Sequence, residues 1–143
     1  TPVSNDLNLS IKEVRKVKDV FIAGSEFKQL KGAKLKYETL VKLPTICLEK
    51  NTSTRKYLDN YLNNKGIVIE PEFELATSDM IVQFTRRNLG IGCVVYDFAE
   101  EYIENGEVFE LEFEEEIPLR NMCIVCDEKR PMSVAGSKMM ELL

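Results

Sequence analysis

With 143 residues, 44% of them hydrophobic and 30% charged, the chain has the composition of an ordinary globular domain and can bury one core or two small lobes. Its formal net charge of −5 and the acidic cluster at 107–116 argue against a DNA-contacting surface, because phosphate contacts require clustered Lys and Arg. Histidine is absent, which excludes a Ser-His-Asp triad and removes the commonest general base and zinc ligand. We therefore expect no enzyme activity, no catalytic residue, no metal site and no cofactor.

The four cysteines are expected to be buried thiols. Cys123 and Cys126 form a C-x-x-C, but they lie in an apolar run typical of a strand. Residues three apart on a strand point to opposite faces, so this pair cannot jointly hold a metal or easily form a disulfide. Cys47 and Cys93 lie in other short apolar runs. Reduced thiols, no export signal and no membrane-length apolar run together predict a cytoplasmic protein without membrane contact.

Hydrophobic periodicity predicts strands and helices that alternate through the middle of the chain. Strands are expected at 11–17, 20–23, 45–49, 67–75, 91–95, 108–113 and 119–126. A helical turn is expected at 37–41, and helices at 55–64, 80–87, 97–104 and 134–143. Pro71 places part of its strand at a sheet edge or in a bulge. The alternation indicates an α/β fold with a largely parallel sheet.

The stretch from 77 to 98 carries the clearest local signals. Thr77, Ser78 and Asp79 are residue types whose side-chain oxygens cap helix N-termini. Asn88 can take the left-handed conformation that ends a helix. Asp97 follows the next buried strand and is expected to cap the helix after it.

Two segments resemble a known family. The segment 77–95, TSDMIVQFTRRNLGIGCVV, is similar to the polar cap, helix, glycine turn and hydrophobic strand in the effector-binding domain of LysR-type transcriptional regulators. The segment 43–62, LPTICLEKNTSTRKYLDNYL, resembles the family's strand, Ser-Thr-Arg turn and helix. The family usually has Gly where this chain has Asn88, and Asn tolerates the same backbone geometry.

The resemblance implies a fold of the type 2 periplasmic-binding-protein-like class, with two lobes joined by two crossover strands. Residues 1–26 and 119–143 would form an incomplete first regulatory lobe, and residues 27–118 a nearly complete second one. Ser25 and Glu26 would lie where the chain crosses between them.

The function implied is an effector-binding and oligomerisation domain of a bacterial DNA-binding regulator. A small molecule would bind in the cleft between lobes, with carboxylates as one candidate class, and the full-length protein would be a dimer or tetramer. DNA would be contacted only through a helix-turn-helix that this chain lacks. The alternative is a solute-binding protein of a small-molecule importer, which shares the fold. Sequence upstream of Thr1 would separate the two, since one requires a helix-turn-helix and the other an apolar signal.

Ligands in open α/β folds lie at the carboxyl ends of strands and at helix N-termini. The residues expected to bind the effector are Thr52, Ser53, Thr77 and Ser78, with Ser25 and Val95 as further candidates. The alternative is that the hydroxyls only cap helices, since Ser and Thr at these positions need no ligand.

Three side chains of the helix at 55–64 have two interpretations each. Arg55 is either half of a solvated pair with Lys56, or a cation that joins the helix N-terminus in attracting a ligand carboxylate. Tyr57 and Tyr61 either belong to a core-facing stripe or contact a second subunit.

Overall fold

The computed structural model describes residues 9–127, and the helix expected at 134–143 lies outside this part. The chain divides into two compact units, one of residues 1–17 and 119–143 and the other of residues 18–118. In the first unit, β1 (Leu9–Val17) pairs antiparallel with β9 (Arg120–Asp127), which confirms both predicted strands. Among the described residues, no helix is long and apolar enough to span a membrane.

The first boundary between the units differs from the expected one. Residues 18–26 were assigned to the first lobe, but the structure groups them with residues 27–118. The reason is that β2 (Asp19–Ala23) pairs with β6 (Ile91–Val95) and β7 (Phe109–Glu110) inside the second unit's sheet. The second boundary lies after Pro118.

The second unit is built on a five-stranded sheet of order β5-β4-β6-β2-β7. β4 (Thr45–Leu48) pairs in parallel with β6 and with the edge strand β5 (Phe73–Leu75). β2 is antiparallel to both of its neighbours, so it alone runs against the other four strands. The sheet is therefore largely parallel, as expected, with one reversed strand.

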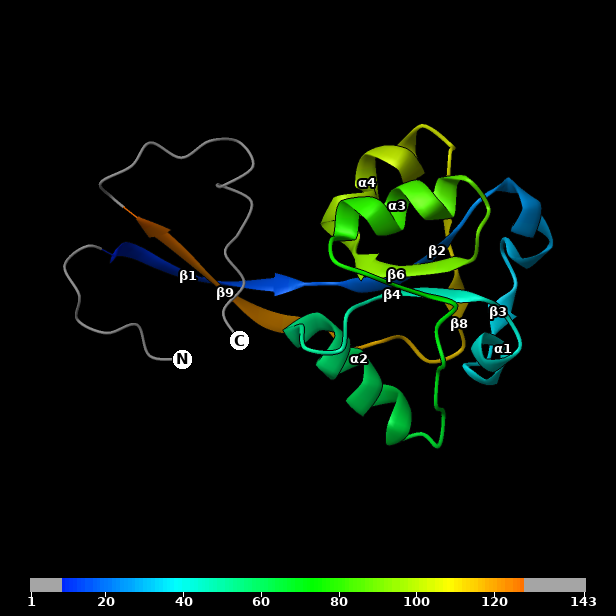
Figure 1. Cartoon of the computed structure of the whole chain (residues 1–143), viewed down its shortest axis with the longest axis horizontal. Helices are drawn as coiled ribbons and strands as arrows, with labels where there is room; N and C mark the ends of the chain where they lie inside the picture. Colours follow the sequence, from blue (N-terminus) through cyan, green and yellow to red (C-terminus); the bar gives the residue numbers. More distant parts are fainter. Residues whose placement is uncertain (1–8, 128–143) are drawn as a thin grey trace. The chain divides into compact units, whose positions relative to one another are not determined.

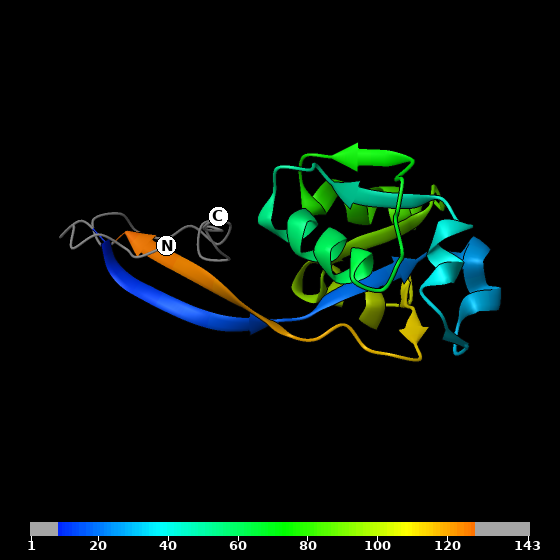
Figure 2. The same cartoon turned by 90° about the horizontal axis from the view of Figure 1, so that it is seen from below.

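Helices cover both faces of this sheet (Figures 1 and 2). On one face, η1 (Ser25–Leu30), α1 (Glu38–Val41) and α2 (Ser53–Asn63) close a core that includes Phe21, Cys47 and Leu62. On the other face, α3 (Ser78–Arg86) and α4 (Tyr96–Glu104) close a second core. A short parallel pair, β3 (Lys34–Leu35) with β8 (Glu112–Phe113), lies beside the first core.

Three predicted elements are corrected. The strand expected at 67–75 is reduced to β5. Residues 67–72, which include Pro71, form an irregular segment before it. The strand expected at 108–113 is split into β7 and β8, which pair with different strands. Asp97 does not cap α4: the helix begins one residue earlier, with Val95 at its N-cap and no side-chain cap bond.

Two residues of the family-like segment, Asn88 in the turn between α3 and β6 and Gly92 within β6, have clear structural roles. Asn88 adopts a left-handed φ of 63°, as predicted, and its Oδ1 accepts a bond from the Glu26 amide at 2.9 Å. Gly92 has no room for a side chain, since a Cβ there would lie 2.2 Å from Thr85 Oγ1 and 2.9 Å from Ile81 Cγ2. This close packing holds α3 flat against β6.

Candidate ligand site at the carboxyl edge of the sheet

Five of the six predicted ligand-binding residues gather at one edge of the sheet. β4, β5 and β6 are parallel, so their carboxyl ends meet at the same edge. Thr52 and Ser53 follow β4, Thr77 and Ser78 follow β5, and Val95 ends β6. Helices α2, α3 and α4 therefore all begin at this edge, which is where ligands of open α/β folds bind.

Ser25 lies at the opposite edge, because it follows the reversed strand β2. Its neighbour Gly24 packs against the end of α3, where a Cβ would meet Asn88 Oδ1 at 2.4 Å and the Thr85 carbonyl oxygen at 2.7 Å. The sequence did not reveal this separation, since the direction of β2 depends on its distant partners.

Thr52 and Thr77 both cap their helices in the way their residue types predict. Thr52 Oγ1 accepts a bond from the Arg55 amide, and Thr77 Oγ1 accepts one from the Met80 amide, each at 3.2 Å. Thr52 also donates its hydroxyl proton to the Glu49 carbonyl oxygen at 2.9 Å. Within residues 9–127, no acceptor takes the proton of the exposed Thr77 hydroxyl. Thr77 thus keeps a donor for a ligand, whereas Thr52 does not.

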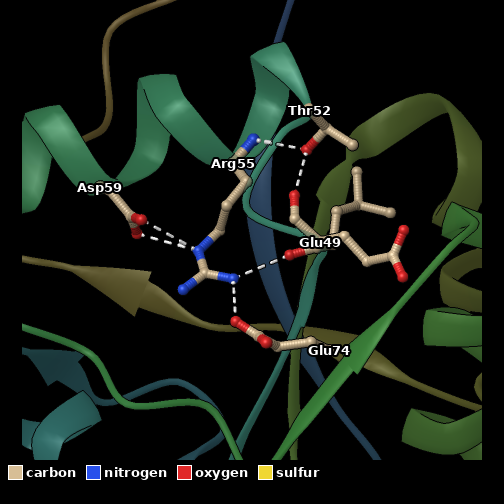
Figure 3. Close-up of polar contacts among 6 residues, drawn as sticks. Glu49, Thr52, Arg55, Asp59 and Glu74 are labelled. Atoms are coloured by element: carbon tan, nitrogen blue, oxygen red, sulfur yellow. Dashed lines mark hydrogen bonds and ion pairs between the residues drawn. The ribbon is translucent and has the colours of Figure 1, made fainter.

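Arg55 contradicts both interpretations that the sequence allowed, since only 3% of its side chain is exposed. Its Nη1 donates to Glu74 at 2.8 Å and to the Leu48 carbonyl oxygen at 2.9 Å, and its Nε donates to Asp59 at 3.1 Å (Figure 3). The guanidinium therefore ties α2 to β4 and β5 and is already neutralised by two carboxylates. Lys56, beside it, is exposed.

The charges of this network shift the pKa values of its members. Burial lowers the pKa of Arg55, but the bonds to Glu74 and Asp59 outweigh it, and the net shift is upward. The same contact with Arg55 lowers the pKa of Glu74. This network could not be predicted from the sequence, because Glu74 lies nineteen positions after Arg55 on a different element. Only Arg55 and Asp59 have the i,i+4 spacing of a helical pair.

At the N-terminus of α4, the third helix that begins at this edge, one backbone amide is already bonded within the chain. Val95 is 2% exposed, and the amide of Tyr96, the first residue of α4, donates to the Lys18 carbonyl oxygen at 2.7 Å. Val95 therefore offers little side chain to a ligand, although its backbone lies at the edge.

A hollow of about 310 Å³ in the second unit was not foreseen from the sequence. Its charged lining includes Lys18, Asp19, Glu110 and Glu116. Lys18 is already paired with Glu110 at 3.0 Å, and Asp19 is buried at 3% exposure. In the sequence, the one signal at Asp19 is its place directly before the apolar run 20–23.

The cysteines and the possible metal ligands of the described residues bear on the predictions made from the sequence. Cys47 and Cys93 are buried thiols outside any disulfide, as predicted, and burial raises the pKa of Cys47 to about 12. Among the described residues, no group of three or more acidic, Cys or His side chains could hold a metal ion.

Comparison with known proteins identifies the class of domain. Residues 2–143 match the family model described as the LysR substrate binding domain, and the chain belongs to this family. The HTH-type transcriptional activator CmpR of Synechocystis sp. is 25% identical over 143 residues, covering 99% of this chain and 46% of CmpR. The chain thus spans about half the length of this curated relative.

Solved structures of the family share the fold. The CcmR regulatory domain of Synechocystis PCC6803 in complex with 2-PG has a TM-score of 0.70 and 17% identity, over 96% of this chain and 66% of that one. The effector-binding domain of QuiR in complex with shikimate has a TM-score of 0.65 and 14% identity, over 96% and 64%. The fold is therefore of the type 2 periplasmic-binding-protein-like class, and the family match favours a regulator over a solute-binding protein.

Proposed function

We propose that the chain is the part of a LysR-type transcriptional regulator that binds a small effector at the carboxyl edge of the second unit's sheet. In this proposal, residues 18–118 are the second regulatory lobe, and the described strands of the first unit belong to the other lobe. Effector binding would bias the arrangement of the lobes, and DNA would be contacted by a helix-turn-helix elsewhere in the full-length protein.

The observation that carries the proposal is the convergence of α2 and α3 at one edge. Both N-termini follow neighbouring parallel strands, and the Glu49 amide donates to the Leu75 carbonyl oxygen at 3.1 Å, so the two loops start side by side. The Thr77 hydroxyl retains its proton for an acceptor. Shikimate bound to QuiR and 2-PG bound to CcmR, both related in fold, support a small molecule as the ligand.

A carboxylate or another anion is the class of effector that this edge fits best. Helix N-termini carry partial positive charge and outward-pointing amides. Arg55 does not add to this attraction, because Asp59 and Glu74 already hold its guanidinium. Recognition would therefore rest on the start of α3, through Thr77 and Ser78, with Ser53 and the Val95 backbone completing the edge.

Pairing of subunits through the β5 side of the sheet is the second part of the proposal. β5 is the end strand of the sheet in the described part of the chain, and Val68 in the preceding segment is 64% exposed. Such an edge can accept another chain. Light scattering on the full-length protein tests this: Val68→Asp is expected to lower the molar mass, and an unchanged mass would contradict pairing on this side.

A thermal-shift screen of small carboxylates on the full-length protein tests effector binding, because a ligand of the folded state raises the melting temperature with concentration. Thr77→Ala is expected to remove the shift, since it deletes the hydroxyl that can donate. Ser25→Ala is the matched control, because it removes a hydroxyl from the opposite edge. Loss of the shift in Ser25→Ala, with retention in Thr77→Ala, would move the site to the other edge.

A further inference from the structure

Three tyrosine hydroxyls hold the segment of chain that leads out of the second unit. Tyr37 donates to the carbonyl oxygen of Glu115 in a short contact, Tyr61 to that of Glu116 at 3.3 Å, and Tyr57 to that of Pro118 at 3.1 Å. We call these side chains the tyrosine row. Two of them lie one turn apart on α2, so the row joins this helix to residues 115–118.

Packing alone does not explain the tyrosine row. Tyr37 stacks on Phe113 with ring centroids 4.7 Å apart and meets Tyr61 edge-on at 5.7 Å, contacts that phenylalanine would make equally well. Phenylalanine lacks only the hydroxyl, and all three tyrosine hydroxyls reach main-chain oxygens of residues 115–118. Burial and the neighbouring Tyr61 raise the pKa of Tyr37, so its phenol stays protonated and donating.

The chain leaves the second unit directly after this anchored segment. Leu119 follows Pro118, and β9 begins at the next residue, where Arg120 pairs with Val17. The other connection is fixed in the same way, since the Lys18 carbonyl oxygen accepts the Tyr96 amide and β2 begins at Asp19. Each connection thus has a fixed residue within one position of the boundary between the units.

We propose that Tyr57 and Tyr61, with Tyr37, are positioning residues that pin the second connection to α2 and so confine its flexibility to Leu119. The inference concerns the mechanics of the second unit and does not require that an effector binds. One consequence does rest on the proposed function: a ligand at the N-terminus of α2, near Ser53, would act on the same helix that holds the connection.

Backbone 15N relaxation on the 143-residue chain tests the pinning. In the unchanged protein, the order parameters of Glu115–Ile117 should match those of the core strand β6, at about 0.85. In Tyr57→Phe/Tyr61→Phe, which keeps both rings and the Tyr37 bond to Glu115, the order parameters of Glu116 and Ile117 should fall below about 0.7 while those of β6 stay unchanged. Two lost donors would free the carbonyl oxygens of Glu116 and Pro118.

The control is Tyr102→Phe, which removes a tyrosine hydroxyl from α4 whose hydrogen-bond contact within residues 9–127 is with Gln83 at 3.4 Å. It should leave the order parameters of Glu115–Ile117 as they were. The proposal is overturned if the double variant also leaves them unchanged, or if they are already low in the unchanged protein. Either result is independent of the effector screen, so failure of one proposal would not be mistaken for failure of the other.

Discussion

The N-termini of α2 and α3 look alike in sequence but differ in what they offer. Each starts with Thr-Ser after a parallel strand, and each Thr caps the amide three residues on at 3.2 Å. At that third position α2 has Arg55, 3% exposed and bonded to two carboxylates, while α3 has Met80, 42% exposed. The N-terminus of α2 is closed by the Arg55 contacts and that of α3 is exposed, so the same capping signal is followed by a buried framework in one helix and by an open surface in the other.

Removing the buried cation Arg55 should have the largest effect on the free energy of unfolding. Arg55→Met is expected to lower the free energy of unfolding by about 3 kcal/mol, because the Leu48 carbonyl oxygen loses its donor and two carboxylates lose their partner. Met80→Ala at the matching position of α3 should change it by less than about 0.5 kcal/mol. Urea denaturation measures both, and equal costs would erase the contrast between the helices.

α3 is held to the sheet by close packing instead of charge, so its sensitive position is Gly92. Gly92→Ala should cost about 2 kcal/mol, since the new Cβ overlaps Thr85 Oγ1 and crowds Ile81. Thr85→Ala in the same chain should recover part of that cost by removing the overlapping oxygen. If the two substitutions prove strictly additive in urea denaturation, the proposed contact is wrong.

Removing the two capping threonines should lower the free energy of unfolding by smaller amounts, which differ between the helices. Thr52→Ala loses a bond to the Arg55 amide and one to the Glu49 carbonyl oxygen, and should cost about 1.5 kcal/mol. Thr77→Ala loses only the bond to the Met80 amide and should cost about 0.7 kcal/mol. Thermal unfolding monitored by circular dichroism compares them, and a larger loss for Thr77→Ala would reverse the assignment of roles.

The smallest expected effect is on the pH dependence of stability, through the pair of Arg55 and Glu74 that closes the N-terminus of α2. Arg55 lowers the pKa of Glu74 in the folded state, so Glu74 contributes stability above its unfolded pKa that is lost as the pH falls through the folded value. Glu74→Gln should therefore make the melting temperature fall less steeply between neutral and acid pH. Glu72→Gln removes an exposed neighbouring carboxyl and is the control for the change of charge. Equal slopes for Glu74→Gln and the unchanged protein would contradict the pairing.

Local signals in the sequence predicted most elements of the fold. Hydrophobic runs located β2, β4 and β6, and residue types located the caps at Thr52 and Thr77 and the left-handed Asn88. Prediction failed where distant partners decide the outcome. The reversal of β2, which separates Ser25 from the other candidates, follows from pairing with β6 and β7.

Side-chain roles were harder to predict than elements. Arg55 at a helix start resembles a surface cation, because its buried partner Glu74 comes from a strand nineteen positions away. Tyr57 and Tyr61 lie on a helical stripe, yet their hydroxyls reach carbonyl oxygens about sixty positions further along the chain. No periodicity within α2 encodes such partners.

The most direct test of ligand binding at the carboxyl edge of the sheet is an NMR titration of the 15N-labelled chain with small carboxylates, beginning with shikimate. We expect the compound that binds to shift the amide signals of Ser53, Ser78 and Asp79 most, and Thr77→Ala to abolish these changes. Shifts centred instead on Ser25, Glu26 and Asn88, or shifts that persist unaltered in Thr77→Ala, would contradict a site at the open start of α3.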